Sequence, residues 1–256
     1  MFKIEGGSAV RVAQQTTPPA AVRPVLQEIE RNYQVAQEAA QDWHPKLWGS
    51  VSVGSVGGTQ KLTLTEGKLL DRLTRDRGLV GLNEAKKIRD DAFLTADARS
   101  PRAGMPPAHV LRQIAALPPG ERADALRSWP GNDGHNDAFR HAYWNARMTA
   151  EFGEAWTKAF TTAHEGNNPG SSTREAMDLY NNEVGRAIAV ANPNASPSQL
   201  ADAVKQALDE GRLVVIDRSG RLAWSNTVAS GDHGMTIGLA APARIGTPGV
   251  VPAAGS

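Results

Sequence analysis

The chain has 256 residues, and its 28 Lys and Arg residues nearly balance its 27 Asp and Glu residues, giving a formal net charge of +1. The 40% of apolar residues can fill a buried core, which excludes wholesale disorder. The absence of cysteine excludes disulfides, thiolate metal sites and cysteine nucleophiles, whereas zinc held by histidine and carboxylate groups stays open. Proteins that bind duplex nucleic acid usually carry a basic excess, so we do not expect nucleic acid as a partner.

Targeting signals are the next feature that the sequence bears on. It contains no run of about 18 apolar residues, so we expect no transmembrane segment. The first ten residues, MFKIEGGSAV, lack the apolar stretch of a secretory signal. We therefore expect synthesis in the cytoplasm, and any export would need a route that does not read such a signal.

The first 130 residues are predicted to be a flexible segment over 1–20 and a helical N-terminal region over 21–130. The flexible segment is polar and contains consecutive prolines. The predicted elements of the helical region are a helix from Val22 to Trp43, a linker from Gly49 to Gly58, helices from Thr65 to Arg77 and from Asn83 to Phe93, a loop over 95–107, and helices Ala108–Leu117 and Pro119–Ser128.

Residues 131–227 are predicted to form the core domain, and residues 228–256, rich in Gly, Ala and Pro, a disordered tail. The stretch RLVVIDRSGRLAWSN predicts a β-hairpin that closes the core domain. The expected class is mainly α, a multi-helix globular domain with a small C-terminal β-hairpin. The predicted core helices are Asn136–Phe152, Glu154–Glu165, one beginning at Thr173 with its hydroxyl as the cap, and Gln199–Glu210.

The first central helix carries an acid and an imidazole on an otherwise apolar face. Positions 137, 141, 144, 148 and 152 share that face, and only its N-terminal end is polar. Asp137 and His141 are i,i+4 neighbours, so the carboxylate can orient the imidazole and raise its basicity. Taken alone, the two residues could equally form a surface ion pair.

The two helices that follow also combine polar groups with an apolar face. His164 ends the apolar face of the second helix, and Asn181 lies within that of the third, between Asp178 and Asn182. Short loops would pack the three helices together, and burying so many polar groups without a purpose would cost several kcal/mol. Their conjunction therefore indicates one functional site.

Some residues of the same types receive a structural interpretation. His44 and His109 are isolated, and a single histidine of this kind is usually a hydrogen-bonded structural residue. His233 falls in the predicted tail, where we expect it to face solvent. Gly185 costs roughly 1 kcal/mol inside a helix, which predicts the close approach of a backbone or a ligand.

The motifs HNDAFRHAYWNARM, AHE and MDLYNNEVGR resemble, in this order, a family found among bacterial secreted effectors and polymorphic toxins. The resemblance covers roughly His135 to Arg186, about a fifth of the chain. It implies a toxin that is secreted, without a signal peptide, into a target cell, and it suggests delivery or docking as the role of the N-terminal region. The implied partners are a cognate immunity protein and a carrier in a contractile, type VI secretion machine. The matching positions are His135, Asn136, Asp137, Arg140, His141, Trp144, His164, Glu165, Asp178, Asn181, Asn182 and Gly185.

The first hypothesis is an antibacterial hydrolase that acts on the cell envelope of a competitor. His141, oriented by Asp137, is the expected general base, with His164 or Glu165 as the second acid or base. An asparagine side chain stabilises the developing negative charge. The expected catalytic residues are Asp137, His141, His164, Glu165, Asn181 and Asn182. The expected substrate-binding residues are His135, Arg140, Trp144 and Asp178.

The cofactor and the substrate are less closely defined by the residues. A metal-assisted variant places a divalent ion among His135, Asp137, His164 and Asp178, although this spacing matches no standard metal motif. The near-neutral charge favours a lipid or peptidoglycan substrate over nucleic acid.

Two alternative hypotheses stay open. The chain could be a non-enzymatic binding or adaptor protein of a secretion system, or a nuclease that uses His and Asn. A catalytic cluster should line a concave pocket, whereas an adaptor should present a flat apolar patch. Plasmid degradation in the presence of Mg²⁺ would identify the nuclease.

Overall fold

A computed structural model describes residues 24–47, 51–52, 59–167 and 171–236. As predicted, the fold is mainly α with a small antiparallel hairpin near the C-terminus. Its helices are α1 (Leu26–Asn32), α2 (Leu64–Arg99), α3 (Ala108–Ala116), α4 (Pro119–Ser128), α5 (His135–Phe152), α6 (Glu154–Glu165), α7 (Ser172–Ala191) and α8 (Pro197–Asp209), with 3-10 helices η1 (Trp129–Gly131) and η2 (Ser225–Thr227). Its strands are β1 (Gln41–Trp43), β2 (Lys46–Leu47), β3 (Val51–Ser52), β4 (Gln60–Leu62), β5 (Val214–Ile216) and β6 (Leu222–Trp224).

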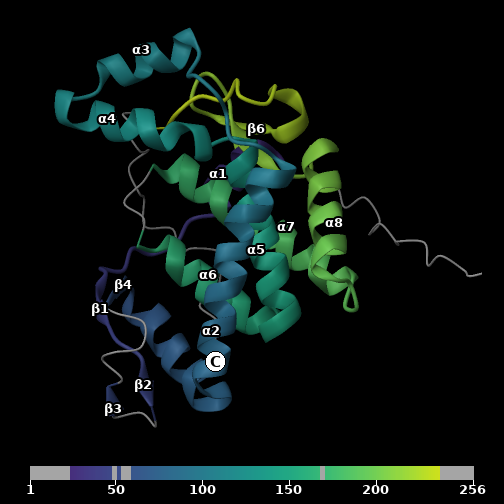
Figure 1. The fold of residues 1–256 in the computed structure, drawn as a ribbon. Coiled ribbons are helices and arrows are strands. Elements are labelled where there is room, and N and C mark those ends of the chain that lie inside the picture. Colours follow the sequence, from purple (N-terminus) through teal and green to yellow (C-terminus); the bar gives the residue numbers. More distant parts are fainter. Residues whose placement is uncertain (1–23, 48–50, 53–58, 168–170, 237–256) are drawn as a thin grey trace, which may run out of the picture.

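Helices α5 and α7 pack against each other at the centre of the molecule, with α2, α6 and α8 around them (Figure 1). The interface is close because small residues line it, among them Ala138, Ala142 and Ala146 of α5, all fully buried. Gly185 of α7 permits the closest approach: a Cβ there would overlap the carbonyl oxygen of Ala142 and lie 2.7 Å from its carbonyl carbon. The predicted close contact at Gly185 is thus confirmed, and a backbone makes it.

The predicted helix from Val22 to Trp43 is wrong beyond Asn32. Helix α1 ends there because the following residues bond to α6 and α7 instead of continuing the helix. The backbone N–H of Val35 donates to the Glu175 carboxylate, and that of Glu38 donates to the carbonyl of Gly166 (3.0 Å). Residues 41–43 then form β1, which pairs with β4.

The predicted break between two helices near residue 80 is real, but it is a bend at a single residue, and the second helix extends further than predicted. Helix α2 is bent at Gly78 (φ 66°, ψ −167°), and its second half runs on to Arg99 through part of the predicted loop over 95–107. It continues because Ala92 and Ala96, four residues apart, are buried in the main core against α5. The two halves of α2, residues 64–77 and 79–99, therefore form a corner.

Two further predictions need correction. Residues 228–236, placed in the disordered tail, pack onto the hairpin and onto η1. His233 is 2% exposed rather than in solvent, and its ring stacks on Trp129 at 4.5 Å between ring centroids. The predicted start of α7 at Thr173 is also wrong, because Ser171 caps the helix. Thr173 lies in the first turn, and its hydroxyl donates to the Glu30 carboxylate (2.7 Å).

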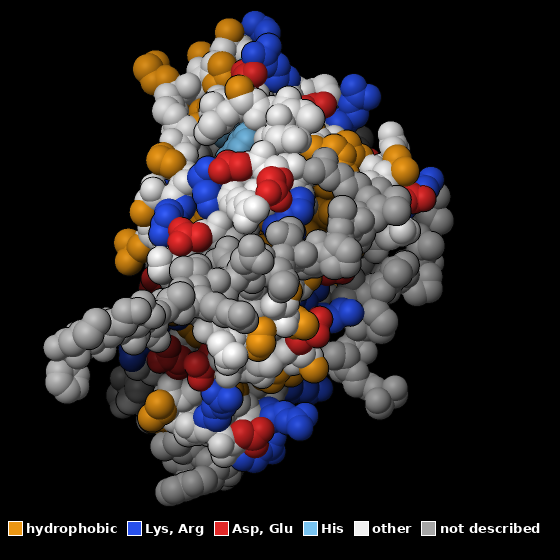
Figure 2. Space-filling model, turned by 90° about the vertical axis from the view of Figure 1, so that its right-hand side faces the viewer, with side chains coloured by type: hydrophobic (Ala, Val, Ile, Leu, Met, Phe, Trp, Pro, Cys, Tyr) orange, Lys and Arg blue, Asp and Glu red, His pale blue; other side chains and the backbone are white. Residues whose placement is uncertain are grey.

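Several predictions concern residues outside the described ranges: the flexible segment 1–20, most of the Gly49–Gly58 linker and residues 237–256 of the tail. Of the helices that the structure describes, none has the length and apolar character needed to cross a membrane. On the face shown in Figure 2, acidic and basic side chains are interspersed among the coloured residues.

Candidate active site

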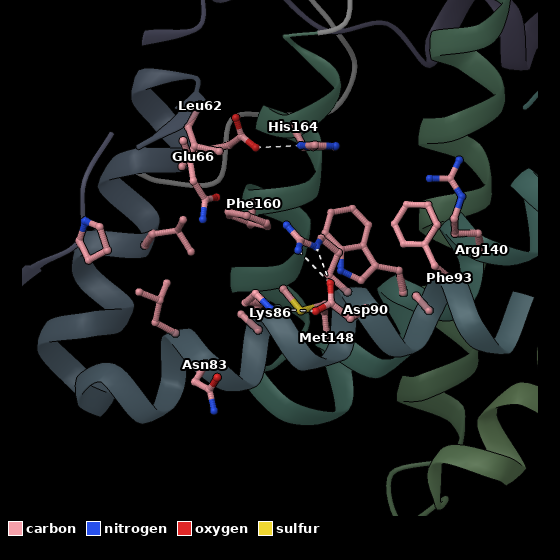
Figure 3. A pocket seen from close by; sticks show the side chains of 18 of the residues that line it. Leu62, Glu66, Asn83, Lys86, Asp90, Phe93, Arg140, Met148, Phe160 and His164 are labelled. Carbon is pink, nitrogen blue, oxygen red and sulfur yellow. Dashed lines mark hydrogen bonds and ion pairs between the residues drawn. The ribbon is translucent and has the colours of Figure 1, made fainter. Parts of the chain in front are cut away.

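A cavity of about 740 Å³ lies between α2, α5 and α6 (Figure 3). The corner at Gly78 lets the two halves of α2 form two of its walls, and α5 and α6 close the space between them. Most of the wall is apolar. The polar side chains that reach it include His141 and Arg140 from α5, His164 from α6 and Glu66 from α2.

The turn before α5 fixes the carboxylate of Asp137. Asp133 adopts a left-handed backbone (φ 66°) and is 1% exposed. Its carboxylate accepts two hydrogen bonds from Arg174 of α7 (2.7 and 2.6 Å), which ties the turn to α7. Its backbone N–H donates to Asp137 Oδ2 (2.7 Å), and Asp137 Oδ1 accepts a hydrogen bond from Arg140.

His141 is enclosed by three carboxylates. Its Nε2 lies 3.4 Å from Asp137 Oδ1 and 3.6 Å from Asp178 Oδ1, and its Nδ1 lies 3.6 Å from Glu165 Oε1. Nδ1 also lies 3.3 Å from Asn182 Oδ1, which is an acceptor because the other atom of that amide, Nδ2, donates to Glu165 (3.1 Å). Both ring nitrogens thus face acceptors, which favours the doubly protonated imidazolium.

The pKa values of this cluster follow from the same geometry. Burial alone would lower the pKa of His141, but the charge of Asp178 and the contact with Asp137 outweigh it and raise the pKa to about 9. Burial works against the ionised form of Asp137, yet Arg140 and His141 hold its pKa well below the usual range. Burial, together with Asp137 and Glu165, raises the pKa of Asp178. His141 is therefore a cation at neutral pH.

Asp178 is buried, and no described residue hydrogen-bonds to its Oδ1, the atom beside His141. Asp137, His141 and Asp178 each offer a donor atom within 4.8 Å of the others, a spacing that could hold one metal ion. The imidazolium of His141 and the guanidinium of Arg140 already supply positive charge to these carboxylates. We therefore interpret the cluster as the environment of a protonated histidine.

A buried amide network holds Asn182 in position behind His141. Asn145, four residues after His141 on α5, donates to Asn182 Oδ1 (2.5 Å) and to the backbone carbonyl of His141 (3.1 Å). Its own carbonyl oxygen accepts hydrogen bonds from Thr161 (2.9 Å) and Arg186 (3.1 Å). The network fixes which atom of Asn182 faces the imidazole, and through it the protonation of Nδ1.

His164 forms a second histidine–carboxylate pair at the cavity. Its Nδ1 lies 2.9 Å from Glu66 Oε1, and its side chain is 50% exposed. Glu66 is 1% exposed, and its Oε2 accepts the backbone N–H of Thr63 (2.7 Å) in the capping box that begins α2. Burial opposes the charge on His164, but the hydrogen bond to Glu66 outweighs it and raises the pKa of His164.

Arg140 and Trp144 also contribute to the cavity wall, as their predicted substrate-binding role requires. The guanidinium of Arg140 lies over the ring of Phe93, 4.7 Å from its centroid, and Figure 3 shows the two side chains together at one end of the cavity. Trp144 stands edge-on to His164, with 5.5 Å between ring centroids. No described residue accepts a hydrogen bond from its indole N–H.

Two predicted site residues lie elsewhere. His135 Nε2 contacts the carbonyl of Ser225 (2.8 Å), so the metal-ligand set that included it does not come together. Asn181 is fully buried and exchanges two hydrogen bonds with the backbone of Val214 (2.9 and 3.0 Å), which fastens the hairpin to α7. Their predicted roles in substrate binding and charge stabilisation are replaced by structural ones.

The sequence interpretation missed Glu66 and Asn145. Asn145 had a usable signal, because it follows His141 by four residues and so shares its face of α5. The only sequence signal at Glu66 is its position in a capping box, and a capping box does not predict a partner 98 residues away.

Stability is expected to depend on pH through His141. Its pKa is raised from 6.5 to about 9 in the folded chain, so its stabilising contribution is complete below pH 6.5 and is lost as the pH rises through 9. We expect the free energy of unfolding to fall by about 3 kcal/mol across this window, because one pKa unit corresponds to about 1.4 kcal/mol. Urea denaturation at a series of pH values measures the slope, which should be weaker in His141→Gln. A stability that is flat or rises over this range contradicts the charge assigned to His141.

Comparison with known proteins gives one match. A family model described as a domain of unknown function (DUF6973) matches residues 121–212, about a third of the chain. The matched span runs from within α4 through α8, so it contains His141 and its three carboxylates but not α2. No curated protein and no solved structure matches the chain.

Proposed function

We propose that this chain is an antibacterial effector that hydrolyses a component of the bacterial cell envelope. The observation that carries the proposal is a histidine, enclosed by three carboxylates, at the wall of a 740 Å³ cavity. A largely apolar cavity with a few convergent polar groups and a strongly shifted pKa is the usual form of an enzyme site. This concave arrangement favours an enzyme over an adaptor with a flat binding surface.

The charge of His141 changes the role expected for it. Because it is protonated at neutral pH, it serves in this proposal as the proton donor rather than the general base. His164 lines the same cavity and is half exposed, so it can exchange protons with water while Glu66 holds its other nitrogen. Arg140 stabilises negative charge that develops on the substrate.

The proposed reaction uses one water molecule. The water oxygen forms a bond to the electrophilic carbon of an ester, and His164 in its neutral form takes a proton from that water. The bond from this carbon to the leaving oxygen breaks, and His141 gives the leaving oxygen its proton. Transfer of a proton from the imidazole of His164 to that of His141 through solvent restores the starting state. Asp137, Asp178 and Glu165 act through His141, whose charge and orientation they maintain.

The biological setting of the proposal is supported by the toxin-like order of the motifs between His135 and Arg186. An effector of this kind acts after secretion into a target cell. Its producer would need a cognate immunity protein, and the secretion machine would need a carrier for it.

Growth assays with the chain in two compartments test the envelope target. Expression with an added periplasmic export signal is expected to reduce viable counts of a sensitive bacterium by orders of magnitude, whereas cytoplasmic expression leaves growth intact. Killing from the cytoplasm alone favours an intracellular target such as nucleic acid, and plasmid integrity then tests for a nuclease. Growth unaffected from either compartment favours the binding-protein alternative.

A further inference from the structure

The shape and lining of the cavity suit a long apolar group. Leu70, Leu79 and Leu82 line it from the two halves of α2, while Met148 and Phe160 line it from α5 and α6. Figure 3 shows Phe160 and Met148 between the two arms of α2. These five side chains come from three helices, so an occupant would be surrounded by hydrocarbon on several sides.

On the α2 side of the cavity, two cationic side chains outnumber the carboxylate that they contact. Lys86 and Arg89 both pair with Asp90 (3.0 and 2.8 Å), so two positive charges share one carboxylate. Arg140 and His141 are already matched by the carboxylates of Asp137, Asp178 and Glu165, so the unmatched positive charge lies at Lys86 and Arg89. A negatively charged head group attached to the apolar occupant would find complementary charge here.

The volume also constrains the occupant. At about 30 Å³ for an atom the size of a water molecule, 740 Å³ holds on the order of 20 non-hydrogen atoms. That is enough for one long acyl chain and its ester group. A glycan of similar size would bring many hydroxyl groups, and the leucine, methionine and phenylalanine side chains of the wall offer them no hydrogen bonds.

We propose that the cavity binds one acyl chain of an anionic phospholipid, with the ester next to His141 and the phosphate near Lys86 and Arg89. The assignment rests on the proposed function, because it names the substrate class of that hydrolase. The bond broken is then the carboxylic ester, and the products are a free fatty acid and a lysophospholipid.

Binding of n-alkylphosphonates of increasing length tests the acyl site without any reaction, because these probes contain no ester. The full chain is titrated below the micellar concentration of each probe, and the fluorescence of tryptophan, which includes Trp144 of the wall, reports binding. We expect the Kd to fall about fourfold for each added methylene, equivalent to about 0.8 kcal/mol, until the cavity is full. Inorganic phosphate should bind far more weakly than any long-chain probe. A Kd independent of chain length overturns the proposal.

A matched pair of variants tests the location. Ala85 lines the cavity on α2, so Ala85→Trp should fill part of it and raise the Kd of the longest probe at least tenfold. Ala98 is exposed on the same helix and does not line the cavity, so Ala98→Trp should bind like the wild type. Unchanged binding by a folded Ala85→Trp chain overturns the assignment of the cavity. Circular dichroism establishes folding, and if Ala85→Trp does not fold, Leu82→Phe on the same wall takes its place.

Two outcomes separate this inference from the proposed function. If the chain binds the long-chain probes as expected but fails to kill from the periplasm, the acyl site stands and the hydrolase proposal fails. If the chain kills from the periplasm but soluble peptidoglycan fragments bind in the cavity in place of the alkyl probes, the hydrolase proposal stands and the acyl site is wrong.

Discussion

Replacing His141 with glutamine is expected to abolish killing from the periplasm and to reduce the rate of ester hydrolysis about 100-fold or more. Glutamine keeps a polar side chain of similar length but cannot carry the proton that the proposed reaction delivers to the leaving oxygen. Viable counts measure the first effect, and fatty-acid release from anionic phospholipid vesicles measures the second. The effect should be the largest of any single substitution at the cavity.

His135→Gln is the matched control, because His135 lies on the same helix but contacts the backbone of Ser225 away from the cavity. It should kill like the wild type. If His141→Gln does not fold, Asp178→Asn tests the same cluster. No described residue hydrogen-bonds to Asp178 Oδ1, so the substitution breaks no hydrogen bond at that atom. That variant should shift the pH at which hydrolysis falls as His141 loses its proton. Wild-type activity in a folded His141→Gln chain would falsify the acid–base assignment.

Gly185→Ala is expected to destabilise the fold by roughly 4 kcal/mol, beyond the usual cost of an overpacked core. In an ordinary helix this substitution stabilises by about 1 kcal/mol, because glycine is the poorer helix former. At Gly185 the added methyl group would overlap the carbonyl of Ala142, and neither backbone can move without separating α5 from α7. Urea denaturation should show a large decrease in the midpoint.

The matched control for this substitution is Gly120→Ala. Gly120 also lies in a helix, α4, and a Cβ there would meet no atom within 4 Å. Alanine at this position should leave the unfolding midpoint unchanged or raise it. Equal effects of the two substitutions would contradict the close packing of α5 on α7.

Local signals in the sequence were sufficient where an element is stabilised by its own residues. The apolar spacing and flanking glycines of α6 predicted Glu154–Glu165 as observed, and the turn residues predicted the β5–β6 hairpin. Residues 33–43 show the limit of this reasoning. Their spacing is helical, but Val35 and Glu38 bond to groups more than 100 residues away, and no local pattern encodes such partners.

The candidate site also contains pairings that the sequence could predict and pairings that it could not. The pairing of Asp137 with His141 was predictable because the two residues are one helical turn apart on α5. The partner of His164 was not, since Glu66 arrives from α2. The sequence also could not distinguish Asn181 from its neighbour Asn182, because which amide faces the hairpin and which faces His141 depends on how α7 is rotated. The raised pKa of His141 depends on Asp178 as well as on Asp137, and Asp178 comes from another helix, α7.

Because α2 supplies much of the apolar wall, the cavity takes its substrate-facing surface and its proton-transfer groups from different parts of the chain. His141 and its carboxylates belong to α5, α6 and α7, inside the span matched by the family model, whereas much of the apolar wall comes from α2, outside it. A related chain could therefore exchange this helix, and with it the shape of molecule admitted, while retaining the proton-transfer groups. Glu66 is one position that such an exchange would have to retain, because its carboxylate bonds to His164 of α6.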